Sequence, residues 1–195
     1  MLSETPQRRL QRLPDFTGKA LNSFTSVLLR HGLPGVLLGF AFLSLPATFV
    51  LLKPSLQPAL ADPSTYLLGG CLIFGAMFGY QFVRERSLDA RQMGWALYLL
   101  GVAAWEEWVF RIALPSWLTD IGLDFRTAVV ASNLVFGLMH YFTLRWKWQW
   151  CLLAFLGGVG LSRNYMMFGD FLLIVAIHWI ATYINTPRYP GQSRA

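Results

Sequence analysis

Five ionisable side chains lie in stretches of the sequence that are otherwise apolar enough to cross a membrane. They are two adjacent glutamates, an arginine and two histidines: Glu106, Glu107, Arg111, His140 and His178. An ionisable side chain at the centre of a bilayer costs roughly 2.5 kcal/mol or more, so groups kept there usually serve a function. A carboxylate together with imidazoles is suited to acid–base chemistry. The sequence therefore predicts a site inside the membrane and favours a hydrolytic one.

The two glutamates are expected to differ in role. Neighbouring residues on a helix point roughly 100° apart, so the two carboxylates face different directions. Glu107 stands four residues before Arg111, which is the favourable order for an ion pair on one helix face. Glu106 has no cation at that spacing and is predicted to be the reactive carboxylate. The alternative is that both glutamates only neutralise Arg111 or cap a helix.

Each histidine shares its helix face with other informative side chains. The companions are Asn133 and Phe136 for His140, and Thr182 and Asn185 for His178. A single histidine on an apolar face more often packs than reacts, so neither position decides anything alone. With a helix rise of about 1.5 Å per residue, Glu106 and both histidines fall at similar middle depths of their segments.

The composition is that of an integral membrane protein. Of the 195 residues, 55% are hydrophobic and 13% are charged, whereas soluble domains have about 25% charged residues. The net charge of +6 is ascribed to basic loops near anionic lipid, and no nucleic-acid partner is expected. Cys71 and Cys151 lie in apolar runs and are interpreted as core residues.

Apolar segments predict an all-α membrane protein, a bundle of about six transmembrane helices with an intramembrane active site. The segments cover about 33–52, 66–83, 93–113, 127–142, 148–161 and 168–185. A span needs about 20 residues, so the last three are short. Pro46 predicts a kink in the first segment, and Pro115 the end or a bend of the third.

The predicted division of the chain has three parts. Residues 1–32 form a basic cytoplasmic segment, 33–186 the helical bundle and 187–195 a carboxyl-terminal tail. With six spans, twelve of the 16 Lys and Arg residues fall on the side of both tails and four on the other side. This bias predicts that both termini are cytoplasmic. The small size and simple topology suggest a bacterial inner membrane.

Three motifs along the chain resemble those of the CPBP intramembrane proteases. The motifs are Glu-Glu-x-x-Phe-Arg from Glu106 to Arg111, Phe-Gly-x-x-His from Phe136 to His140, and the late intramembrane His178. This family includes the eukaryotic CAAX prenyl protease 2 and bacterial Abi proteins. The resemblance covers about residues 93–185, and Ser132-Asn133 precedes the second motif much as in the family.

The resemblance implies an intramembrane endopeptidase that acts on a membrane-bound peptide or protein. In that scheme the glutamate matching Glu106 activates water, with the histidine matching His140 nearby. The histidine matching His178 supports the site and the developing oxyanion. No cofactor is firmly implied, although the family is often called a metalloprotease. Glu106, His140 and His178 could hold a divalent metal such as zinc with an open position, but no His-Glu-x-x-His spacing is present.

Two positions depart from the family pattern. Thr182 stands where the family has an asparagine that donates to the oxyanion, and Ile112 stands where it has a glycine. The threonine hydroxyl can donate as well, and Asn133 or Asn185 could replace it. The catalytic residues themselves are retained.

Two other classes of protein remain open from the sequence. One is a non-catalytic membrane scaffold, chaperone or immunity protein that keeps the same fold. The other is a small transporter that uses the glutamates and histidines as a proton relay. Transporters usually show repeat symmetry, and the sequence has no internal repeat.

Overall fold

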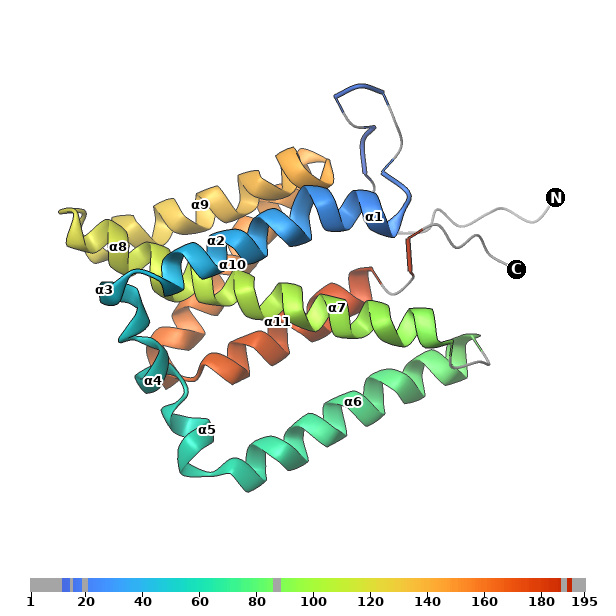
Figure 1. The fold of residues 1–195 in the computed structure, drawn as a ribbon, viewed down its shortest axis with the longest axis horizontal. Coiled ribbons are helices and arrows are strands. Elements are labelled where there is room, and N and C mark those ends of the chain that lie inside the picture. The colour runs from blue at the N-terminus through green and yellow to red at the C-terminus, as the bar shows by residue number, and fades with distance from the viewer. Residues whose placement is uncertain (1–11, 15, 19–20, 86–88, 187–188, 191–195) are drawn as a thin grey trace.

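The computed structural model describes residues 12–14, 16–18, 21–85, 89–186 and 189–190. Over these residues the regular structure is helical, apart from one isolated bridge between Arg12 and Trp146. The prediction of an all-α membrane protein is confirmed. Figure 1 shows the helices as one bundle, with α6 (Pro63–Glu85) set apart along its lower edge.

Four helices are long and apolar enough to cross a membrane. They are Phe24–Leu43, which joins α1 (Phe24–Val27), η1 (Leu28–Gly32) and α2 (Leu33–Leu43); Pro63–Val83 of α6; α9 (Phe125–Leu144); and α10 (Trp148–Phe168). Two further apolar segments also form helices. One runs without a break through α7 (Ala90–Glu107), η2 (Trp108–Ala113) and α8 (Leu114–Asp120), and the other is α11 (Phe171–Asn185).

The predicted bounds of the first segment are wrong at both ends. The helix begins at Phe24, so residues 24–32 belong to it, although the sequence places them in a basic segment. It ends at Leu43 because Leu45 is extended, with φ −81° and ψ 122°, as expected before a proline. Pro46 therefore opens a new short helix, α3 (Pro46–Phe49), instead of kinking a long one. Two more short helices, α4 (Leu52–Ser55) and α5 (Gln57–Ala61), lead to α6.

Two other expectations on helix length are also corrected. Pro115 does not end its helix, because it lies in the first turn of α8, directly after the wider π-helical stretch η2. The segments predicted as short at 127–142 and 148–161 are α9 and α10, with 20 and 21 residues. Both reach the length that a membrane span requires.

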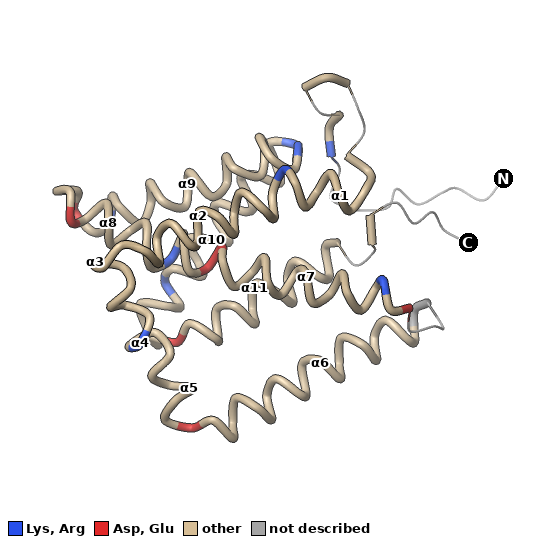
Figure 2. The backbone as a smooth tube through the Cα atoms, viewed as in Figure 1, with Lys and Arg blue, Asp and Glu red and all other residues tan. Residues whose placement is uncertain are grey.

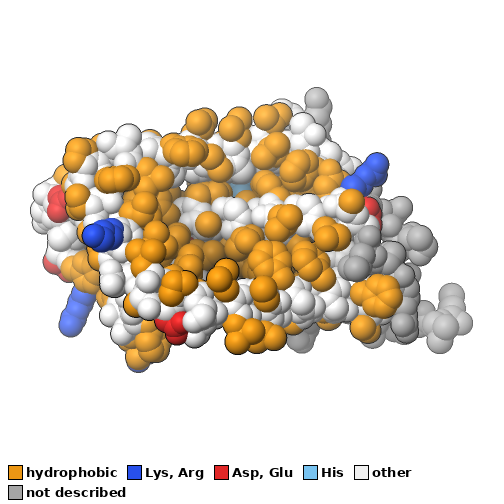
Figure 3. Space-filling model, turned by 60° about the horizontal axis from the view of Figure 1, so that its bottom comes forward, with side chains coloured by type: hydrophobic (Ala, Val, Ile, Leu, Met, Phe, Trp, Pro, Cys, Tyr) orange, Lys and Arg blue, Asp and Glu red, His pale blue; other side chains and the backbone are white. Residues whose placement is uncertain are grey.

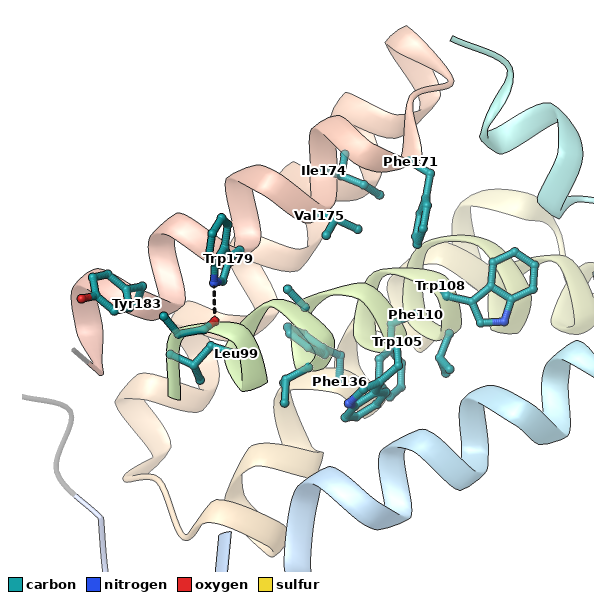
Figure 4. Close-up of a cluster of buried hydrophobic side chains, with 14 of the residues drawn as sticks. Leu99, Trp105, Trp108, Phe110, Phe136, Phe171, Ile174, Val175, Trp179 and Tyr183 are labelled. Atoms are coloured by element: carbon teal, nitrogen blue, oxygen red, sulfur yellow. Dashed lines mark hydrogen bonds between the residues drawn. The ribbon is translucent and has the colours of Figure 1, made fainter. Parts of the chain in front are cut away.

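The helix from α7 to α8 runs through the middle of the bundle. It contacts α2 through α7 and η2, and it contacts α9 through η2 and α8. In addition, α7 packs along α11. Figure 4 shows side chains of α11 pointing at α7, among them Phe171, Ile174 and Val175. Trp179 on the same helix donates a hydrogen bond from Nε1 to the carbonyl oxygen of Ala96, at 2.8 Å. These contacts hold α11 in register with α7.

A glycine lets the first membrane helix approach α7 closely. A Cβ atom at Gly35 would lie 2.0 Å from the Trp105 ring, so only glycine fits there. Small residues of this kind allow close backbone approach between membrane helices. The approach brings His31, one turn earlier, into the centre of the bundle.

The outer surface suits lipid. Figure 3 shows a face covered mostly by hydrophobic side chains, and Figure 2 shows that Lys, Arg, Asp and Glu lie chiefly at helix ends, apart from an interior group. The exposed side chains of α6 include Leu67, Leu68 and Leu72. The interior group contains Glu106, Glu107 and Arg111, all of which are buried.

Candidate functional site

Glu106 lies in the last turn of α7 with 1% of its surface exposed, and three imidazoles surround it. His31 Nε2 lies 3.1 Å and His140 Nε2 3.7 Å from Glu106 Oε1. His178 Nε2 lies 3.4 Å from the other oxygen, Oε2. The histidines come from η1, α9 and α11, so three separate helices meet at one carboxylate. The structure thus brings together the three residues that the sequence proposes as catalytic.

His31 is the residue that the sequence reasoning missed. It falls in the stretch assigned to a basic cytoplasmic segment, yet its side chain is buried. One signal was present: Val27, His31, Gly35 and Gly39 recur every four residues, and all four are buried. That spacing indicates one face of a helix that begins before residue 33.

Glu107 is fully buried and is bound on both sides. Its Oε2 lies 3.1 Å from Arg111 Nε, so the ion pair predicted from the spacing is present. Its Oε1 lies 2.6 Å from His178 Nδ1. His178 therefore stands between the two glutamates, with one ring nitrogen facing each of them.

Arg111 continues this network away from Glu106. Its Nη1 donates to Asn133 Oδ1 at 2.9 Å. Asn133 in turn donates from Nδ2 to the Val129 carbonyl at 2.8 Å and to Ser162 Oγ at 2.9 Å. A Cβ at Gly158 would fall 2.3 Å from Asn133 Oδ1, so a glycine on α10 leaves room for the amide. Asn133 thus serves Arg111 and is not free to donate to an oxyanion.

The other residues named from the sequence lie around the histidines. The Phe136 ring packs edge-on against His140, with 4.7 Å between centroids, and Arg111 Cζ lies 4.3 Å from the Phe136 centroid. Asn185 is exposed and donates to the Ala181 carbonyl of its own helix, at 2.8 Å. Thr182 lies one turn after His178 and lines the same cavity as that histidine.

A cavity of about 470 Å³ leads to this group between α10 and α11. His140, His178 and Thr182 form part of its wall. The facing wall on α10 includes Gly157, Gly158 and Gly160, where the lack of side chains widens the space. A second, smaller space of about 30 Å³ borders His31, Glu106, His140, His178 and Thr182. A space of that size holds one or two water molecules.

One trio among the described residues is compact enough to hold a metal ion. The ligand atoms of His31, Glu106 and His140 all lie within 4.8 Å of one another. The sequence instead groups Glu106 and His140 with His178, which lies on the far oxygen of Glu106. Two imidazoles and one carboxylate are a donor set that zinc accepts. The residues present therefore fit a divalent metal.

Both π-helical stretches carry residues of this site. His31 lies in η1 and Arg111 in η2. Such stretches are rare and often occur at functional positions, because the wider turn redirects side chains. The irregular turns and the buried ionisable groups thus coincide.

The structure is that of an all-α membrane protein with a buried glutamate surrounded by histidines in its interior. Residues 89–184 match the family described as type II CAAX prenyl endopeptidase Rce1-like, and this match supports assignment to the CPBP/CAAX protease family. No curated protein and no solved structure gives a significant match. The matched region contains all three motifs, but it begins at residue 89 and therefore does not include His31.

Proposed function

We propose that this protein is an intramembrane endopeptidase that hydrolyses a peptide bond of a membrane-associated protein or peptide. One observation carries the proposal. Glu106, on the helix that bears the first family motif, lies within 3.7 Å of His140 and within 3.4 Å of His178, and both histidines border a cavity. A carboxylate, two imidazoles and room for substrate are the parts that peptide hydrolysis requires.

The roles of the residues follow from their placement. Glu106 would take a proton from a water molecule held by His140, while the water oxygen attacks the peptide carbonyl. The oxygen of the tetrahedral intermediate would face His178 Nε2 and the Thr182 hydroxyl. Glu106 would then return the proton to the departing nitrogen as the C–N bond breaks. A divalent ion, where bound, would supply Lewis-acid activation.

Glu107 and Arg111 would position the site without touching substrate. Glu107 fixes the His178 ring through Nδ1, at 2.6 Å. A hydrogen bond at Nδ1 fixes the tautomer and the orientation of the imidazole ring, and therefore the direction in which Nε2 points. Arg111 neutralises Glu107 permanently, since a guanidinium stays protonated in proteins.

The cavity between α10 and α11 would admit the substrate. Its walls carry exposed apolar side chains such as Leu153 and Ile177, so a chain segment already in the membrane can approach from the lipid side. The polar end, at His140 and His178, would receive the scissile bond.

We also propose that both termini are cytoplasmic and that the membrane is a bacterial inner membrane. The Phe24 ring at the start of α1 stacks on Tyr189, after α11, with 5.5 Å between centroids. The start of the first described helix thus lies beside the end of the last one. The bias of Lys and Arg supports the cytoplasmic side.

The decisive experiment compares Glu106→Gln with Asp124→Asn. Both changes convert a carboxylate to an amide, but Asp124 is an exposed helix cap where asparagine serves equally well. A mass-spectrometric survey of membrane-protein termini should lose the cleavage products with Glu106→Gln and keep them with Asp124→Asn. Identical surveys for wild type and Glu106→Gln would instead favour the non-catalytic scaffold.

A further inference from the structure

His31 stands apart from the rest of the site because it comes from outside the region that matches the family. The match covers residues 89–184, whereas His31 lies in the first membrane helix. It nevertheless makes the shortest contact that any histidine makes with Glu106, at 3.1 Å. Its ring also lies 5.5 Å from that of His140 and 5.6 Å from that of Trp105.

The hydrogen bonds of two histidines fix which ring nitrogen carries a proton. His140 Nδ1 lies 2.8 Å from the Phe136 carbonyl oxygen, which can only accept. Thr143 donates its single hydroxyl proton to the Met139 carbonyl at 2.8 Å. Its oxygen therefore accepts from His31 Nδ1, at 2.9 Å. In both neutral rings Nε2 is left with a free lone pair.

These lone pairs converge on an oxygen that can only accept as well. No hydrogen bond of acceptable geometry reaches Glu106 Oε1 from any described residue, although this atom is fully buried. Three electron-pair donors thus face one another: His31 Nε2, His140 Nε2 and Glu106 Oε1. Such a group requires a cation among its members, which is either a proton on one of the two Nε2 atoms or a bound metal ion.

The distances suit a metal ion of zinc size. The edge of a tetrahedron with metal–ligand bonds of 2.0–2.1 Å is roughly 3.3 Å. The two distances from Glu106 Oε1 are 3.1 and 3.7 Å, and the three atoms all lie within 4.8 Å. The space of about 30 Å³ beside them offers room for a water at a fourth position. In metal-bound histidines, the ring nitrogen that does not bind the metal typically donates a hydrogen bond to a neighbouring oxygen, as Nδ1 of His140 and of His31 do here.

We propose that His31, Glu106 and His140 form a divalent-metal site of the zinc type, with His31 as a ligand supplied from outside the family region. This inference rests on the proposed function only in placing the metal at the reacting end of the cavity. Glu106 would bind through Oε1, and Oε2, beside His178, would stay available as a proton acceptor.

The test measures binding to the full-length protein in detergent after chelator treatment, with zinc and cobalt(II) as probes. Wild type should bind one equivalent of either metal, and cobalt(II) should give the visible spectrum of a four-coordinate site. His31→Gln should weaken zinc binding by about 100-fold or more, and Thr143→Val by about 10- to 100-fold through loss of the bond behind the ring. Size-exclusion chromatography and thermal unfolding would establish that each variant is folded.

His178→Gln is the matched control for metal binding. His178 also contacts Glu106 but lies on Oε2, so zinc affinity and the cobalt(II) spectrum should stay unchanged. The proposal is overturned if folded wild type binds no stoichiometric metal, or if His178→Gln loses the metal while His31→Gln keeps it. Cleavage by a wild type that binds no stoichiometric metal would refute the site and leave the proposed function standing. Metal binding through His31 without any cleavage would do the opposite.

Discussion

Glu106 and Glu107 are adjacent in the chain, yet they face two different regions of the interior. Glu107 belongs to a network with Arg111, Asn133 and Ser162, in which the paired polar atoms lie 2.9–3.1 Å apart. Among the described residues, the ion-pair contacts of Glu106 are all with imidazoles, and Glu106 borders a water-sized space. The first region holds a permanent ion pair, while the second holds groups that can gain or lose a proton.

This difference indicates how a membrane interior can hold a reactive carboxylate. A buried charge needs a partner, and a guanidinium is always charged. An arginine beside Glu106 would therefore hold it as a permanently paired anion. Protonated imidazoles can balance the charge of the Glu106 carboxylate, and neutral imidazoles leave that carboxylate without a counter-charge. Under the proposed function, Glu107 supports the fold and Glu106 carries out the chemistry.

His178 joins the two regions, so its loss should lower the rate strongly, second only to the loss of Glu106. His178→Ala should lower turnover by about 10²- to 10⁴-fold, as for loss of an acid–base group. The replacement also leaves Glu107 with Arg111 as its remaining close partner, so insertion should persist. Steady-state cleavage in detergent measures this effect. Full activity in both His178→Ala and Thr182→Ala would mean that His178 only packs in the interior and takes no part in the reaction.

Replacement of Arg111 should distinguish the two regions by its effect on the stability of the fold. Arg111→Met should destabilise the fold by about 3–5 kcal/mol, because it leaves Glu107 buried without a permanent counter-charge. Adding Glu107→Gln to that variant should recover part of the loss. Glu106→Gln should change thermal stability far less than Arg111→Met. Equal losses of stability in the two single variants would show that both glutamates are structural.

Thr182 tests the oxyanion side of the reactive region. Thr182→Ala should slow turnover by up to about 10²- to 10³-fold if its hydroxyl donates to the oxyanion. Thr182→Asn restores the residue of the family pattern and should keep or raise activity. If the hydroxyl only bonds its own helix, Thr182→Ala would shift the melting temperature slightly and leave the rate unchanged.

Gly35 tests whether the first helix must approach this closely. Gly35→Ala places a methyl group into the Trp105 ring and should cost about 1–3 kcal/mol, with His31 displaced. Gly39→Ala is the matched control, since its Cβ would lie an ordinary 3.6 Å from Trp105 Cβ. Thermal unfolding of the two variants should differ accordingly. Equal melting temperatures would mean that the close approach is not needed.

The sequence predicted those parts of the site that follow from local helix geometry. The Glu107–Arg111 pair follows from a four-residue spacing, and the meeting of Glu106, His140 and His178 agrees with their similar depths. The place of Asn133 was not predictable, because Gly158 and Ser162 on another helix decide it. Such contacts between helices leave no trace in the periodicity of one segment.

His31 shows the same limit in another form. Its neighbours Arg30 and the basic residues before it suggested a solvated segment, and its partner Glu106 lies 75 positions later in the chain. The burial of His31 depends on the fit of Gly35 against Trp105, which is a property of two helices together. The fold class was predictable because composition alone requires it.

The π-helical stretch η2 has a consequence for deletions. A π-bulge amounts to one additional residue inserted into an α-helix, and η2 begins directly after Glu107. Removing one residue between Glu107 and Arg111 would set Glu106, in place of Glu107, four positions before the arginine. Glu107 would then stand three positions before the arginine, so the phase of a single turn decides which glutamate is paired with Arg111.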